Sequence, residues 1–167
     1  SGDLLACFGV FDGHITSNAS SHAKRTMLGA LIANGADAPS SPLETSCVAA
    51  FREVESSFAR SQRSLFSACL NPRLSNSAGG TTACVALLQM LPWGADPRVD
   101  VVVANAGDSG ALLVYDGNQM PRTKWLTRCH SPDDPLEAKR LTDAGARLGR
   151  MRREGKEVGP MRSYPGG

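Results

Sequence analysis

The sequence predicts an α+β domain with antiparallel strands, and three observations lead to this class. An uncharged apolar segment at residues 4–11, LLACFGVF, has the composition of a buried strand. Two segments with helical spacing of apolar residues follow it, and several strand-forming segments then succeed one another. The order of strand, helix pair, strand cluster and helix is typical of the α+β class, in which sequential strands pair antiparallel.

The two helices after the first strand are predicted from their apolar stripes. The first helix is predicted over residues 18–34, with Gly35 as its stop signal. Its apolar stripe consists of Ala23, Met27, Leu28, Leu31 and Ile32. The second helix starts with Ser41 as N-cap, Pro42 in the first turn and Glu44 as capping-box acid. Its apolar face continues through Cys47, Phe51, Val54, Phe58 and Leu65. Neither stripe is wide enough for burial on all sides, so the pair should cover one face of a sheet.

The strand cluster follows a loop at residues 71–80. Its predicted strands are residues 81–91, 99–105, 110–115 and 124–127. Asp116, Gly117 and Asn118 form a hairpin turn between the last two. A third helix should begin at residues 132–135 and end near Gly145. From Arg147 onward the sequence is basic and rich in glycine, which predicts an irregular tail.

Size and charge set limits on what the chain binds. Its 167 residues fit one domain, and a formal charge of +2 gives no strong field to attract nucleic acid or a membrane. Basic residues gather after Arg147, which is compatible with a basic patch or with a solvated charged loop. The sequence contains no apolar segment long enough to span a membrane. We therefore expect neither a nucleic-acid nor a membrane partner, and a monomer.

The five cysteines favour a reducing compartment. They are an odd number, they are widely spaced, and no CxxC pair occurs among them. A disulfide framework and a zinc site are therefore not expected. We expect an intracellular protein, in the cytoplasm or the nucleus.

The strongest chemical signal is Asp12, Gly13 and His14, which come directly after the first strand. A carboxylate at a strand end can bind a hard cation, and glycine lets the backbone carbonyl turn toward the same ion. An imidazole beside them can supply a proton at neutral pH. Taken alone, Asp-Gly after a strand is also an ordinary turn.

Four segments, taken together and in order, resemble the PP2C (PPM) family of metal-dependent Ser/Thr protein phosphatases. The segments are FGVFDGH at 8–14, SAGGTTACVALL at 77–88, VVVANAGDSGALLV at 101–114 and LTRCHSPDDPLEAKRLTDAGAR at 126–147. Their order and approximate spacing agree with the family along nearly the whole chain. The resemblance implies an α/β/β/α sandwich of antiparallel sheets flanked by helices, of which this chain carries an incomplete part.

The resemblance also implies a function and a set of site residues. It implies hydrolysis of phosphoserine and phosphothreonine in proteins by a water that two Mn²⁺ or Mg²⁺ ions activate. Asp12 would bridge both ions, the Gly13 carbonyl would bind one of them, and His14 would protonate the leaving oxygen. Asp108 corresponds to a ligand of a third, weaker metal site. It is equally compatible with an acid that orders its own tight turn.

The sequence departs from the family at three positions. Ile15 stands where a small residue, most often glycine, is usual, Gly110 where an arginine commonly follows Gly-Asp-Ser, and Cys129 where an aspartate is frequent. Ile15 should reshape the turn into the first helix, and Gly110 removes a charged anchor. His22 and His130 are expected to be surface or capping residues.

We expect residues 1–167 to be a single, partial phosphatase domain of a longer protein, inactive on its own. The chain opens on a strand without an initiator Met, and the resemblance places further metal ligands of the family upstream of Ser1 and beyond Gly167. Two alternatives remain open. One is a pseudophosphatase that serves as a binding or regulatory module, and the other is an unrelated α+β domain with a fortuitous Asp-Gly-His.

Overall fold

The computed structural model describes residues 3–38, 42–69, 79–91, 98–117 and 120–164, with only the backbone for 63–69 and 91. The chain forms two compact units, one up to Thr127 and one from Arg128 onward. The elements of the first unit are β1 (Asp3–Val10), β2 (Gly13–His14), α1 (Asn18–Ala33), α2 (Leu43–Cys69), β3 (Gly80–Thr81), β4 (Ala83–Leu91), β5 (Arg98–Ala106), β6 (Leu112–Tyr115) and β7 (Arg122–Trp125). Those of the second are α3 (Pro135–Asp143), β8 (Arg147–Arg153) and β9 (Lys156–Tyr164). The assignment of residues 1–167 to a single domain stays a prediction.

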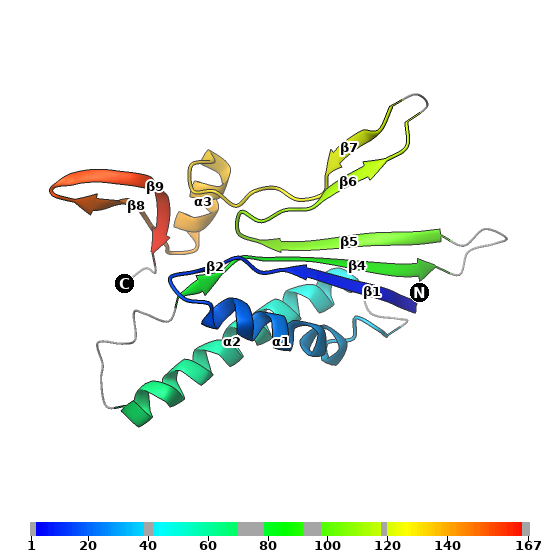
Figure 1. The fold of residues 1–167 in the computed structure, drawn as a ribbon, viewed down its shortest axis with the longest axis horizontal. Helices are drawn as coiled ribbons and strands as arrows, with labels where there is room; N and C mark the ends of the chain where they lie inside the picture. The colour runs from blue at the N-terminus through cyan, green and yellow to red at the C-terminus, as the bar shows by residue number, and fades with distance from the viewer. Residues whose placement is uncertain (1–2, 39–41, 70–78, 92–97, 118–119, 165–167) are drawn as a thin grey trace. The chain divides into compact units, whose positions relative to one another are not determined.

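The first unit is organised around a three-stranded antiparallel sheet in the order β1-β4-β5 (Figure 1). Phe8 pairs with Ala86, and Ala86 pairs on its other side with Val103. β2 with β3 and β6 with β7 form two further antiparallel pairs. The predicted antiparallel α+β class is therefore confirmed.

The core lies between β4 and the two helices, which cover one face of the sheet (Figure 1). Val85 and Leu87 point from β4 into this core, Leu31 enters it from α1, and Ala50 enters it from α2; all four are fully buried. Alternate residues of a strand face the same side, so one covered face buries every second residue of β4. The expectation that the helix pair covers one sheet face is confirmed.

The helix stripes differ in part from the predicted ones. In α1, Ala23, Met27 and Leu31 are buried as predicted, whereas Leu28 and Ile32 are about half exposed. Successive helical residues are 100° apart, so the burial of Leu31 and Met27 leaves Leu28 and Ile32 on the flank of the helix. In α2, Cys47 and Val54 are buried and Phe51 packs against the core. The side chains of Ser41 and Leu65 lie outside the described residues.

The opposite face of the sheet is apolar and exposed in the described chain. Phe8 and Val10 of β1 are 62% and 61% exposed, and Met90, Val99 and Val101 of β4 and β5 are also exposed. The prediction of β1 as a buried strand is therefore wrong for this face. Because the helices cover only one side, the alternate residues of β1 have no cover among the described residues of this unit.

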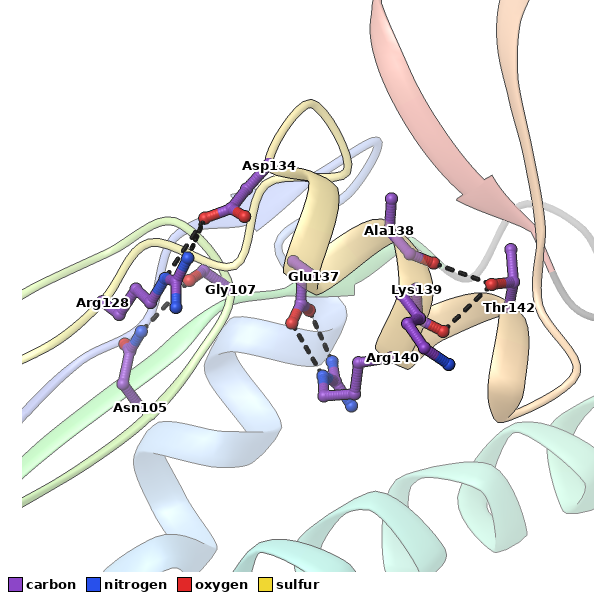
Figure 2. Close-up of polar contacts among 9 residues, drawn as sticks. All are labelled: Asn105, Gly107, Arg128, Asp134, Glu137, Ala138, Lys139, Arg140 and Thr142. Atoms are coloured by element: carbon purple, nitrogen blue, oxygen red, sulfur yellow. Dashed lines mark hydrogen bonds and ion pairs between the residues drawn. The ribbon is translucent and has the colours of Figure 1, made fainter.

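In the second unit, α3 begins with a capped first turn. Asp134 accepts a hydrogen bond from the backbone N–H of Leu136 at 2.9 Å, and Pro135 occupies the first helical position. Arg128 donates to the same carboxylate at 2.6 Å, and Arg140 pairs with Glu137 one turn away (Figure 2). The hydrogen bond from Arg128 lowers the pKa of Asp134, and that from Arg140 lowers the pKa of Glu137. Both contributions to stability are present above pH ~4 and decline as the pH falls through the lowered values.

The predicted irregular tail is a β-hairpin. β8 pairs antiparallel with β9, with Arg153 opposite Lys156. Glu154 and Gly155 connect them with φ values of 52° and 77°. Two consecutive residues with positive φ form the turn that fits the twist of a two-residue hairpin loop. Both faces of β8 and β9 are largely exposed, so the strands carry charged residues on both sides. The sequence therefore lacks the apolar alternation from which a strand is predicted.

Truncation of Leu31 should destabilise the protein far more than truncation of Leu28. The Leu31 side chain has no exposed surface, so Leu31→Ala leaves a cavity and should cost about 2–5 kcal/mol. Leu28 on the same helix is half exposed, and Leu28→Ala should cost under ~1 kcal/mol. Equilibrium urea unfolding measures both, and equal losses would contradict the described core.

Candidate active site

Asp12 lies between β1 and β2, where the backbone leaves the central sheet. Its carbonyl accepts a hydrogen bond from the N–H of Thr82 at 2.9 Å, and its own N–H donates to the hydroxyl of Thr82 at 3.2 Å. The two bonds hold both polar groups of the Asp12 backbone against Thr82, while the Asp12 side chain stays exposed. The Asp12 backbone is therefore anchored at the end of β1, and its carboxylate faces solvent.

Gly13 and His14 form the short strand β2, which pairs with β3. Gly13 lies opposite Thr81, and His14 lies opposite Gly80. A Cβ on Gly80 would lie 2.6 Å from Cε1 and 2.7 Å from Nε2 of His14. The imidazole therefore rests directly over Gly80, in space that any larger residue would occupy. A Cβ on Gly13 would lie 2.6 Å from the Ser20 hydroxyl of α1, so a larger residue at this position would have to displace Ser20.

His14 also borders a cleft of about 210 Å³ between the two helices and the β2–β3 pair. His22 lines the same cleft, with its Nε2 2.7 Å from the Ser57 hydroxyl. Ser57 donates its own proton to the Val54 carbonyl, so the Nε2 of His22 acts as the donor to Ser57. His22 thus joins α1 to α2 and is half-buried, which corrects the expectation of a surface or capping residue.

Asp108 lies in the tight turn after β5. Gly107 has a φ of 108°, and a Cβ there would lie 2.8 Å from Cγ2 of Thr82. The amide of Asn105 donates to the Gly107 carbonyl at 3.1 Å (Figure 2). The hydroxyl of Ser109 is 2.5 Å from that of Thr82. The turn is therefore packed onto Thr82, with the Asp108 carboxylate exposed.

The predicted site residues come from two segments that Thr82 holds together. Asp12, Gly13 and His14 are contiguous at the end of β1, and the turn with Asp108 meets them through Thr82. Thr82 is a residue that sequence reasoning missed. Its only signal was its place after the glycine pair of SAGGTT, at the break between β3 and β4.

The donors at this site fit Mg²⁺ or Mn²⁺ in kind. Asp12 and Asp108 supply carboxylate oxygens and Gly13 supplies a backbone carbonyl, which are the hard ligands that these ions prefer. Among the described residues, no three His, Cys, Asp or Glu side chains cluster as a metal site. The described ligand set is therefore suitable in chemistry and partial in number.

The structure shows the local surroundings of the three positions at which the sequence differs from the residues usual in the family. Ile15 has a φ of 69° and is 76% exposed, so a β-branched residue occupies the left-handed region that favours glycine. A Cβ on Gly110 would lie 2.8 Å from the Thr127 hydroxyl, which accepts a hydrogen bond from the N–H of Ala111. Gly110 is exposed, yet any side chain at this position would have to displace the Thr127 hydroxyl. Cys129 is an exposed free thiol.

The sheets and helices place the protein in the class of antiparallel α+β folds, with an Asp-Gly-His segment at the end of the first strand. Residues 2–159 match the family model of Protein phosphatase 2C. The chain belongs to this family, which confirms the resemblance of its four segments.

Individual relatives agree with this assignment. The chain is 30% identical over 146 residues to a probable protein phosphatase 2C 59 of Arabidopsis thaliana, covering 86% of this chain and 39% of the relative. It is 28% identical over 169 residues to a probable protein phosphatase 2C 69 of Oryza sativa subsp. japonica, covering 98% of this chain and 34% of the relative. The chain thus spans between a third and two fifths of these relatives' length.

A solved structure shares the fold. The serine-threonine phosphatase 2C from Toxoplasma gondii superposes with a TM-score of 0.60 at 20% identity, over 89% of this chain and 47% of that one. The predicted PP2C-like α+β fold is confirmed. Among the described residues, no helix is long and apolar enough to cross a membrane.

Replacing Ile15 with glycine should stabilise the protein by about 1 kcal/mol. The left-handed backbone costs a β-branched residue about 1–2 kcal/mol, and the exposed side chain loses little packing. Part of the gain is offset by the greater freedom of glycine in the unfolded chain. Thermal unfolding measures the change. Ile15→Ala, which keeps a Cβ, should gain less, and a loss of stability in Ile15→Gly would contradict the left-handed turn.

Replacing Gly80 with alanine should displace the His14 ring without unfolding the protein. The added methyl would overlap the ring, which is exposed and able to rotate away. In ¹H–¹³C spectra the Cε1–H signal of His14 should shift, while that of His130 should stay. Gly29→Ala in α1 is the control, because its Cβ meets no atom within 4 Å and alanine favours the helix by roughly 1 kcal/mol. An unmoved His14 signal in Gly80→Ala would refute the contact.

Proposed function

We propose that the protein is a metal-dependent protein phosphatase that hydrolyses phosphoserine and phosphothreonine. The observation that carries the proposal is the anchored strand end in which Asp12, Gly13 and His14 occur together in a PP2C-family chain. The names of the relatives support the reaction class and specify no substrate for this chain.

Each site residue has a role in this proposal. The Asp12 carboxylate, the Gly13 carbonyl and the Asp108 carboxylate would hold Mn²⁺ or Mg²⁺. The bound ions supply Lewis-acid chemistry that lowers the pKa of a water to near neutrality. Donors outside the described cluster must complete the coordination, since each ion takes about six oxygens.

His14 acts on the leaving group. As hydroxide adds to phosphorus, the bond from phosphorus to the seryl or threonyl oxygen breaks, and that oxygen takes the bonding electron pair. Imidazolium at position 14 donates a proton to this oxygen, which leaves as a neutral hydroxyl. The His14 ring packs over Gly80 and is exposed on its other side, where a substrate could reach it. The substrates are phosphoproteins, the protein acts as a monomer, and its compartment is the cytoplasm or the nucleus.

A pseudophosphatase is the second candidate, and Gly110 favours it. A Cβ at this position would lie 2.8 Å from the Thr127 hydroxyl, so the arginine that is common in the family would require the Thr127 side chain to move. In this case the fold would serve as a binding or regulatory module. The two candidates differ in a single measurable property, which is turnover.

Replacing Asp12 with asparagine should abolish manganese-dependent phosphate release from a phosphothreonine peptide. The change removes one negative charge from a site that must offset two dications, and the rate should fall by roughly 100-fold or more. The assay compares this chain with the product of the complete reading frame, each with and without the substitution. Activity in the longer product, lost in Asp12→Asn, would support the proposal, and activity that persists in Asp12→Asn would refute it.

The control for this substitution is Asp37→Asn, an exposed aspartate after α1 that lies outside the proposed site. It changes the charge by the same amount and should leave the rate unchanged. A folded longer product that releases no phosphate would favour the pseudophosphatase. If the longer product releases phosphate and residues 1–167 alone do not, the expectation that this segment is inactive by itself is confirmed.

A further inference from the structure

We propose that Thr82 is a positioning residue that sets the spacing between the two metal-binding segments. Its single side chain contacts both the backbone of Asp12 and the turn that carries Asp108. This inference rests on the proposed role of these two aspartates as metal ligands. Thr82 itself supplies no ligand in the proposal.

The hydrogen-bond arrangement explains why a hydroxyl is needed at this position. The oxygen of Thr82 accepts the N–H of Asp12 at 3.2 Å and lies 2.5 Å from the hydroxyl oxygen of Ser109. A hydroxyl has one proton and two lone pairs, so it can accept from Asp12 and still share a hydrogen bond with Ser109. A methyl group in the same place can do neither.

The backbone and the methyl group of Thr82 complete the contact. Its N–H donates to the Asp12 carbonyl at 2.9 Å, which closes a reciprocal pair with the bond to the hydroxyl. Its Cγ2 lies against Gly107, where a Cβ would come within 2.8 Å. Thr82 is thus fixed to the Asp12 segment by two hydrogen bonds and to the Asp108 turn by one hydrogen bond and one close packing contact.

This geometry assigns Thr82 a role in metal affinity. The Asp12 segment and the Asp108 turn are 96 residues apart in sequence, and loss of the hydroxyl removes one hydrogen bond to each of them, which loosens their spacing while the sheet still holds the strands. Residues that orient metal ligands typically change metal affinity by 10- to 100-fold when they are removed. Binding of Mn²⁺ should therefore weaken, while the rate at saturating Mn²⁺ should recover.

The test compares three variants of the product of the complete reading frame. Thr82→Val keeps the shape and removes the hydroxyl, Thr82→Ser keeps the hydroxyl, and Ser109→Ala keeps both bonds to Asp12 and removes the bond to the turn. Mn²⁺ binding is measured by electron paramagnetic resonance of the free ion, without substrate. We expect about tenfold weaker binding or more in Thr82→Val, recovery in Thr82→Ser and an intermediate loss in Ser109→Ala.

The matched control is Thr26→Val in α1. The Thr26 hydroxyl donates only to the His22 carbonyl of the same helix, away from Asp12 and the Asp108 turn. Its Mn²⁺ affinity should equal that of the wild type. Thermal unfolding without metal shows whether each variant is folded, and Ser109→Ala decides the question if Thr82→Val does not fold.

The outcomes separate this inference from the proposed function. Unchanged Mn²⁺ affinity in Thr82→Val and Ser109→Ala, beside a wild type that binds Mn²⁺ and releases phosphate, overturns the role of Thr82 alone. Weaker Mn²⁺ binding in both variants supports the role of Thr82, whether or not the wild type hydrolyses the peptide. Absence of hydrolysis by the wild type overturns only the proposed phosphatase activity. A wild type that binds no Mn²⁺ overturns both.

Discussion

The burial of one face of β4 is the constraint on which the first unit depends. This strand has β1 and β5 as its two neighbours, and its Val85 and Leu87 are fully enclosed by the helices. Each large apolar side chain that is fully buried contributes about 1.5–3 kcal/mol, and the alternation of the strand leaves no other register that buries the same set. The position of β4 therefore fixes the positions of both neighbouring strands, and with them the ends from which Asp12 and Asp108 emerge.

The site follows from the way β4 begins. The chain crosses from β3 to β4 at Thr82, whose side chain and backbone bind the end of β1 and the turn after β5. One residue before β3, Gly79 has a φ of 71°, and a Cβ there would clash with the His14 carbonyl. The glycine pair and the threonine thus form one surface, against which the Asp-Gly-His segment is held. Because the start of β4 is tightly packed and continuous with the rigid core, Asp12 and Asp108 are held at a defined separation.

Sequence reasoning predicted most of this arrangement because its elements have simple periodicities. The apolar runs predicted β1, β4 and β5, and the motifs predicted Asp12, Gly13, His14 and Asp108 as one site. The misses have physical reasons. The β8–β9 hairpin has exposed strands, which carry no apolar alternation, and the exposure of Phe8 depends on what covers the second face of the sheet. The role of Thr82 depends on contacts between residues far apart in sequence, and no local pattern records them.

The departures at Ile15 and Gly110 are of two physical kinds, and this difference bears on the choice between enzyme and pseudophosphatase. Ile15 stores backbone strain in an exposed turn, yet the hydrogen bonds that hold Asp12 and the Gly80 surface under His14 are intact beside it. At Gly110, in contrast, any side chain would begin 2.8 Å from the hydroxyl of Thr127 and would have to displace it. Strain at Ile15 can be relieved by one substitution that leaves the site unchanged, whereas an arginine at position 110 would require Thr127 to move. Restoring the charged anchor would therefore need a second change at Thr127, whereas the strain at Ile15 needs none.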